Sequence, residues 1–179
     1  MLKQVALALC VTVLAVVLGA TALSDTYKVT RSCEIAASPE KVYGILVNAE
    51  QHAHWAPWRA LDTGMEVQVG EVKSGVGATY SWESKSHGSG AYTIKRVTEP
   101  VRIEAEIDLG ESGQMYATWK IEPVEAGVSV LFRYVGEATG ILGRYFALGI
   151  DGAVGPIFED ALERLKREAE RQASESTEQ

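Results

Sequence analysis

The sequence predicts an α+β domain in which an antiparallel sheet of about six or seven strands precedes one long carboxy-terminal helix. Short segments of alternating apolar and polar residues, separated by Gly and Pro turn signals, follow one another from residue 27 to residue 136. Apolar residues then recur at three- and four-residue steps between Ile141 and Arg171, which is the helical period. The uncharged, almost wholly apolar run from Val5 to Leu23 predicts a further helix at the amino terminus.

The composition fits one globular domain and argues against nucleic acid as a partner. The chain has 179 residues, 46% of them hydrophobic and 23% charged, which is enough for one substantial core. Its net charge of −7 disfavours phosphate binding, which needs a basic face. Cys10 and Cys33 lie in an apolar run and an expected strand, so we predict two separate thiols and no disulfide.

The amino-terminal segment, residues 1–24, reads as a membrane anchor or a signal segment. As a helix, Val5–Leu23 would span about 28 Å, close to the hydrocarbon thickness of a bilayer. An Ala-x-Ala site at residues 20–22 keeps a cleaved signal peptide open, in which case the domain would be secreted. The length of the run favours an uncleaved single-pass anchor, with the domain on the extracytoplasmic, periplasmic side.

The domain, residues 25–172, begins with a strand that leads directly into a helix. Alternation predicts a strand over Tyr27–Ala37. Ser38 is a good N-cap and Pro39 suits the first helical position, which predicts a helix over Pro39–Asn48. A second short helix is expected over Glu50–Pro57, because the proline ends it.

The sheet continues through six further expected strands. The segment Val101–Leu109 alternates most regularly, so one of its faces should be buried, and Arg102 and Glu104 should point to solvent. The expected strands, bounded by turn signals, are Met65–Val69, Ala78–Glu83, Ala91–Thr98, Val101–Leu109, Gln114–Glu122 and Val128–Gly136.

The long carboxy-terminal helix is expected to be interrupted once. Pro156 lacks a backbone N–H, which predicts a kink or break near Gly152–Gly155. Residues 173–179 are polar and are expected to form a disordered tail.

Three segments in this order resemble the polyketide cyclase/dehydrase family of the START-like (Bet v 1-like, SRPBCC) superfamily. They are the strand, Ser-Pro-Glu and helix that lead to Trp55–Trp58 (Trp-Ala-Pro-Trp), then Gly75–Trp82 (GVGATYSW), and then Gly155–Lys166. The resemblance covers residues 27–172. It implies a helix-grip fold, in which a curved sheet wraps around the carboxy-terminal helix and leaves a cavity between them. Activity does not follow from it, because one fold hosts many functions.

Large side chains on the strands and near the second helix are the expected lining of such a cavity. We expect these ligand-binding residues: Trp55, Trp58, Tyr80, Trp82, Trp119, Phe132 and Phe146. The alternative is that they fill a solid core. Trp55 and Trp58 could gate ligand entry, but we favour the alternative that they close one end of the sheet as part of the core.

Polar residues give only weak catalytic candidates. Asp151 interrupts an apolar stretch and His54 lies near the two tryptophans, so these two are the candidates for acid–base chemistry. For Asp151 a capping or helix-breaking role beside Gly152 is the stronger alternative. His52 and His54 would diverge on a helix, and no phosphate loop or catalytic triad is recognisable, so we expect no metal and no cofactor.

Together these observations predict a membrane-tethered domain that binds a hydrophobic small molecule, such as a lipid, a quinone or a polyketide-like compound. Two alternatives remain open at this point. One is an enzyme of the cyclase or dehydratase type, which would need an ionisable side chain in the cavity. The other is an accessory module that binds a protein and has no working cavity, which a wide exposed apolar patch would favour.

Overall fold

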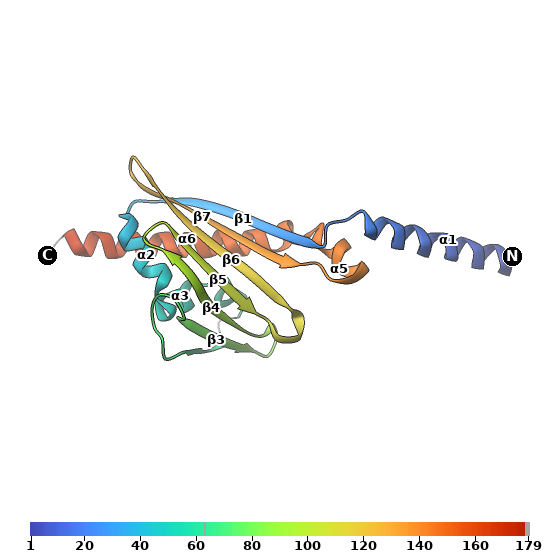
Figure 1. The fold of residues 1–179 in the computed structure, drawn as a ribbon, viewed down its shortest axis with the longest axis horizontal. Coiled ribbons are helices and arrows are strands. Elements are labelled where there is room, and N and C mark those ends of the chain that lie inside the picture. The colour runs from blue at the N-terminus through green and yellow to red at the C-terminus, as the bar shows by residue number, and fades with distance from the viewer. Residues whose placement is uncertain (63, 178–179) are drawn as a thin grey trace.

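A computed structural model describes residues 1–62 and 64–177 and contains one seven-stranded antiparallel sheet with the order β1-β7-β6-β5-β4-β3-β2 (Figure 1). The strands are β1 (Thr26–Ile35), β2 (Glu66–Val69), β3 (Thr79–Ser84), β4 (Gly88–Thr98), β5 (Arg102–Asp108), β6 (Gln114–Val124) and β7 (Gly127–Glu137). The seven expected strands are therefore confirmed, with their ends moved by up to three residues. A register shift in β4 between Ile94 and Arg96 adds local twist to the sheet.

Three short helices follow β1 instead of the two that we expected. Helix α2 (Pro39–Val47) begins as predicted, since the Ser38 side chain accepts a hydrogen bond from the backbone N–H of Lys41. Helix α3 (Ala49–Trp55) is capped by Asn48, and α4 (Pro57–Leu61) begins at the proline that was expected only to end its predecessor. Proline both ends one helix and suits the first position of the next, so the missed helix has a simple cause.

The break in the carboxy-terminal helix lies earlier than predicted. Helix α5 (Gly140–Ala147) ends and α6 (Ile150–Thr177) begins around Gly149, with a bend of 59° between the two. Pro156 lies inside α6, so the prediction of a break near Gly152–Gly155 was wrong. Helix α6 also continues to Thr177, so residues 173–177 of the expected tail are helical, and residues 178 and 179 lie outside the described part.

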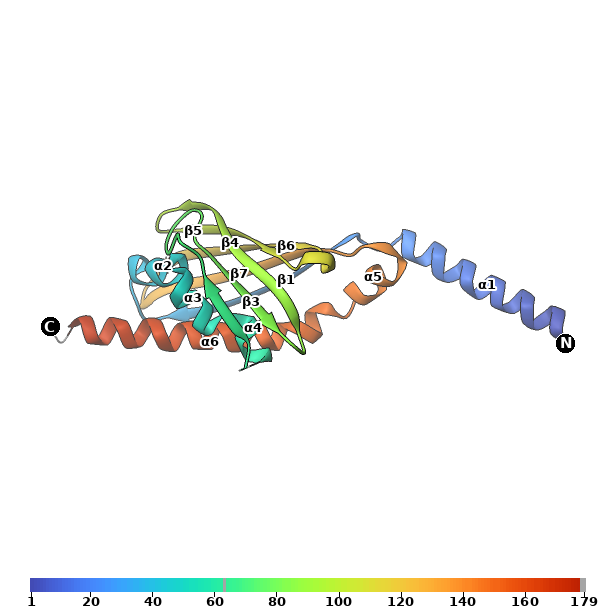
Figure 2. The same ribbon diagram turned by 90° about the horizontal axis from the view of Figure 1, so that it is seen from below.

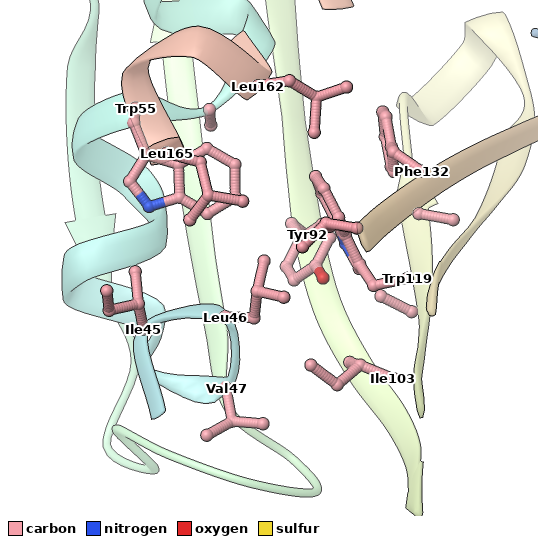
Figure 3. Close-up of a cluster of buried hydrophobic side chains, with 14 of the residues drawn as sticks. Ile45, Leu46, Val47, Trp55, Tyr92, Ile103, Trp119, Phe132, Leu162 and Leu165 are labelled. Atoms are coloured by element: carbon pink, nitrogen blue, oxygen red, sulfur yellow. The ribbon is translucent and has the colours of Figure 1, made fainter. Parts of the chain in front are cut away.

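Helix α6 lies along the concave side of the sheet and supplies one wall of the core (Figure 2). Its buried residues recur at helical spacing: Phe158, Leu162, Leu165 and Ala169. They meet a stack of aromatic rings from the sheet and α3. In this stack the rings of Trp119 and Phe132 lie 3.9 Å apart and nearly parallel (Figure 3). This part of the interior is a solid core.

Arg31 on β1 forms two ion pairs with α6. Its guanidinium group is bonded to the carboxylates of Asp151 (2.9 Å) and Glu159 (2.7 Å), one turn on either side of Gly155. A Cβ atom on Gly155 would collide with that guanidinium group, so the glycine provides the space that the arginine occupies.

Helix α1 (Leu2–Thr21) projects away from the sheet at the end opposite the carboxyl terminus (Figure 1). It is long and apolar enough to cross a membrane, with a mean hydropathy of 2.3, and only 6% of its apolar window is buried. Such a helix is consistent with a membrane anchor or a signal sequence. The thiols of Cys10 on α1 and Cys33 on β1 are both free.

Candidate functional site

An apolar cavity of about 250 Å³ lies between the sheet, α4 and the first half of α6. Its position matches the cavity that the resemblance implies, although it occupies only the end of the interior that the aromatic stack leaves open. The exposed residues Leu61 and His87 mark its opening. The lining residues are Tyr27, Pro57, Trp58, Leu61, Met65, Trp82, His87, Leu109, Met115, Tyr134, Ile150, Val154, Ile157 and Phe158.

Two glycines in the sheet leave room for two aromatic side chains that line the cavity. Tyr27 is paired with Gly136, and its ring lies where a Cβ atom of that glycine would be. From there its hydroxyl donates to the sulfur of Met115, at 3.0 Å, on the far side of β7. Trp82 lies over its partner Gly90 in the same manner. Because glycine has no side chain, these rings can lie close against the sheet.

Trp58 on α4 covers the Trp82 ring and lines the cavity beside it. Its indole stacks on that of Trp82, with ring centres 4.9 Å apart and planes 8° from parallel. Its N–H donates to the Tyr80 hydroxyl at 3.0 Å, which satisfies the polar atom of an otherwise apolar wall. The two tryptophans are thus fixed in place and form one apolar wall of the cavity.

Tyr134 contributes a polar group to the cavity lining. The residue is buried on β7, and among the described residues its hydroxyl has no hydrogen-bond partner. Burial, followed by the nearby Tyr27, raises its pKa, so the hydroxyl stays protonated and can both donate and accept a hydrogen bond.

Behind this wall lies a buried histidine that the sequence did not single out. His52 on α3 is 1% exposed, and its Nδ1 atom is 3.0 Å from the Tyr80 hydroxyl. Burial lowers its pKa to about 3, because an imidazolium ion would lose its hydration there. Since Trp58 donates to the Tyr80 oxygen, the Tyr80 proton is available to Nδ1. This assigns the imidazole proton to Nε2, which has no partner among the described residues.

His87 brings an ionisable group to the opening of the cavity. It lies in the turn between β3 and β4, and its Nδ1 atom is 2.9 Å from the Ser86 hydroxyl. Ser86 is in turn 3.3 Å from the hydroxyl of Ser84, which donates to the Asp62 carboxylate at 2.6 Å. The bond from Ser84, the backbone N–H of Gly64 and the nearby His87 hold the pKa of Asp62 below its usual value. The result is a chain of hydrogen bonds that ends at an imidazole.

The residues that we expected to bind a ligand are separated into three groups. Trp58 and Trp82 line the cavity, and Tyr80 lies directly behind them. Trp55, Trp119 and Phe132 are buried in the solid core on the other side of His52. Phe146 is 69% exposed on α5 and lies outside both.

The two catalytic candidates are apart from the cavity and from each other. Asp151 is exposed in the first turn of α6 and bonded to Arg31, which holds the pKa of its carboxyl group below the usual value. His54 is exposed on α3 and borders a separate charged groove between α3 and α6. In residues 1–62 and 64–177, no three His, Cys, Asp or Glu side chains are grouped so that they could hold a metal ion.

Several lining residues are absent from the predicted ligand-binding residues: His87, Leu61, Met115, Tyr134 and the cavity face of α6. Strand alternation does assign Met115 and Tyr134 to strand faces that could line a cavity, whereas the turn that carries His87 has no such period. The role of His52 depends on which face of a seven-residue helix is buried, and this helix is too short to show a stripe.

The comparisons with known proteins agree with this architecture. The family described as polyketide cyclase/dehydrase and lipid transport matches residues 26–170. None of the curated proteins matches the chain.

Several solved structures share the fold. SA2116 of Staphylococcus aureus, a protein of unknown function, has a TM-score of 0.63 at 15% identity, over 86% of this chain and 97% of its own. The KanY protein has a TM-score of 0.60 at 19% identity, over 82% of this chain and 99% of its own. CV1439 of Chromobacterium violaceum has a TM-score of 0.55 at 19% identity, with the same coverage of both chains as KanY. At such identities the likeness concerns the fold. The family match spans most of the chain, and we conclude that this protein belongs to the polyketide cyclase/dehydrase and lipid transport family, a branch of the START-like superfamily.

Proposed function

We propose that this protein binds one small apolar molecule in the cavity between the sheet and α6 while α1 tethers it to a membrane. The apolar cavity carries the proposal. Its walls are almost wholly hydrocarbon and aromatic, and burial of a ligand's apolar body there would supply most of the binding free energy. The hydroxyl of Tyr134 would orient the ligand through a polar end.

The size of the cavity narrows the ligand class. Pockets for drug-sized molecules usually hold about 300–1,000 Å³. A cavity of about 250 Å³ therefore suits a single ring system or one acyl chain rather than a two-chain lipid. A quinone head group, a fatty acid or a polyketide-like ring fits this description. An apolar tail could extend through the opening between Leu61 and His87.

A membrane tether would hold the domain where an apolar ligand is most concentrated. Apolar molecules are concentrated in the bilayer, and a domain held at its surface would meet them there. The length and exposure of α1 support an uncleaved anchor. The extracytoplasmic position of the domain follows the usual orientation of signal anchors and is part of the proposal.

Native mass spectrometry of the full-length protein, released from detergent micelles after expression in a bacterial host, tests the binding proposal. A matched pair of variants makes it specific. Val154→Phe places a ring in the cavity, whereas Val124→Phe makes the same change at an exposed position at the far end of β6. We expect a bound mass on the wild type and on Val124→Phe, and a strongly reduced one on Val154→Phe. Equal occupancy in all three proteins would contradict the proposal.

A second function, acid–base catalysis of the cyclase or dehydratase type, is favoured by one observation. His87 places an imidazole at the cavity opening, hydrogen-bonded through Ser86 toward Asp62. A proton acceptor in that position could act on an enolisable carbon of a bound polyketone. If the reaction includes a dehydration, which releases one water, the molecule bound to His87→Gln should be one water heavier than the product bound to the wild type. Ring closure alone conserves mass, so it should change the chromatographic retention of the released molecule instead. Identical masses and identical retention would leave binding as the function.

A further inference from the structure

Helix α5 carries an exposed apolar surface that neither the core nor the cavity uses. None of its eight residues is buried, and Leu142 and Phe146 are 83% and 69% exposed. Leu148, which follows the helix directly, is 68% exposed. Ile141 and Tyr145 extend this surface along the same helix. Other exposed apolar side chains of the described domain are mostly scattered singly, which is ordinary for a protein surface. A contiguous set of this kind marks a surface that something covers.

We propose that α5 lies in the interfacial layer of the membrane that α1 spans, so that the lipid bilayer covers this apolar surface and the cavity opens beside it. The proposal rests on the tether of the proposed function and identifies where the ligand comes from. It concerns a different element, however, and can fail while the tether stands.

Three contacts hold α5 against the carboxyl end of α1. The Arg144 guanidinium group donates to the backbone carbonyls of Ala20 (3.1 Å), in the last turn of α1, and Leu23 (3.2 Å), just after that helix. The Tyr145 hydroxyl donates to the carbonyl of Val16 at 2.9 Å. A Cβ atom on Gly19 would collide with that hydroxyl, so the glycine allows the close approach. Figures 1 and 2 both show α5 between α1 and the sheet.

These contacts fix the depth of α5. The contacts on α1 itself run from Val16 to Ala20, which is four residue steps or about 6 Å along the helix axis, and Leu23 lies just beyond the helix. Amphipathic helices at membrane surfaces bury their apolar face by about 5–10 Å. If α1 crosses the bilayer, α5 is held at this depth, where tyrosine and arginine side chains are well tolerated.

A bilayer fits the surface better than a protein does. The apolar surface of α5 adjoins that of α1, which is almost completely exposed and needs hydrocarbon around it. One helix of eight residues also offers much less than the roughly 800 Å² that each partner contributes to a stable protein interface.

The same segment connects the membrane surface to the cavity. Leu148 is part of the exposed surface, and two residues later Ile150 begins the α6 wall of the cavity, followed by Val154. A helix in the interface would therefore hold the α5 end of the cavity close to the lipid, so an apolar ligand could reach the cavity over a short distance.

Fluorescence of labelled full-length protein in phosphatidylcholine/phosphatidylglycerol vesicles tests the proposal. A Cys10→Ser, Cys33→Ala background receives one new cysteine, either Leu142→Cys on α5 or Val76→Cys as a control. Val76 is also exposed and apolar but lies in the loop before β3. Each cysteine carries an NBD fluorophore, and some vesicles contain lipid with a doxyl quencher high on the acyl chain. We expect blue-shifted emission at 142 that the quencher reduces several-fold more than emission at 76.

Flotation of the same samples after alkaline extraction reports separately whether α1 is inserted. Protein that floats while the label at 142 emits as in water would overturn the α5 proposal and leave the tether intact. Blue-shifted emission that the lipid quencher does not reduce would also overturn it, because a protein surface would then cover α5. Protein that fails to float would overturn the tether and the α5 proposal together.

Discussion

Acidification from pH 7 to pH 5 is expected to destabilise the folded domain through His52. The pKa of this imidazole falls from 6.5 to about 3 on folding, because the ring is buried among aromatic side chains without a charged partner. At pH 5 the ring is therefore neutral in the folded protein and protonated in the unfolded one. Stability is fully present above the unfolded pKa and is lost progressively as the pH falls from about 6.5 toward 3.

The linkage relation gives the size of the effect. Between pH 7 and pH 5 the unfolded state gains about 2 kcal/mol by binding a proton at residue 52 that the folded state cannot bind. Carboxyl groups contribute little in this window. Asp62, Asp151 and Glu168 have pKa values that folding lowers from 3.8, 3.8 and 4.5, so their stabilisation is lost only at lower pH.

Urea unfolding of the full-length protein in detergent, followed by tryptophan fluorescence at pH 7, 6 and 5, measures this loss. His52→Asn keeps a polar atom near the Tyr80 hydroxyl but cannot be protonated, so its free energy of unfolding should change little over the same range. His54→Gln removes an exposed imidazole and should lose as much stability as the wild type. An equal loss in wild type and His52→Asn would refute the reasoning, whatever their absolute stabilities.

Three further outcomes follow from the packing. Gly90→Ala should lower the free energy of unfolding by about 1–3 kcal/mol and shift tryptophan emission, because the new methyl group displaces the Trp82 indole; an unchanged spectrum and stability would contradict this placement. Trp119→Ala should lower the free energy of unfolding by about 3–5 kcal/mol, because it leaves a buried site empty. Phe146→Ala removes an exposed ring and should change the same free energy by no more than about 0.5 kcal/mol in detergent. Comparable losses for the two variants in chemical denaturation would contradict the assignment of one ring to the core and the other to the surface. The Cys33 thiol should react with iodoacetamide at pH 8 about 100-fold more slowly than a free thiol, because burial raises its pKa to about 11, and rapid modification measured by mass spectrometry would disprove its shielding.

Local signals in the sequence were sufficient to predict most of the fold. The Ser38 cap and the proline after it fix where α2 begins, and the alternation of β5 fixes which of its residues face inward. These features depend on neighbours a few residues away, so they are visible in one sequence. The position of the break before α6 was missed because Pro156 is a strong local signal, yet packing against the sheet keeps the helix intact there.

The candidate site was harder to predict, because its geometry depends on partners far apart in the chain. Asp151 was taken as a catalytic candidate, but its partner Arg31 is 120 residues away on β1. In the sequence, an exposed apolar residue such as Phe146 cannot be distinguished from a core residue. A membrane-facing surface and a protein core both favour apolar side chains, so the residue type is the same in both. Only the arrangement of the helices distinguishes the two.

The division of the interior into a filled half and a hollow half has a kinetic consequence. Behind Tyr134 and Phe158 the stack of Phe132 and Trp119 fills the interior, so a ligand of this chamber would enter and leave through the opening that Leu61 and His87 mark among the described residues. Uptake of a second molecule must then wait for departure of the first. Exchange would be strictly sequential, with a rate set by dissociation and independent of the supply of competitor. Such a chamber is suited to holding a molecule and reporting its presence, and it is poorly suited to serving as a conduit.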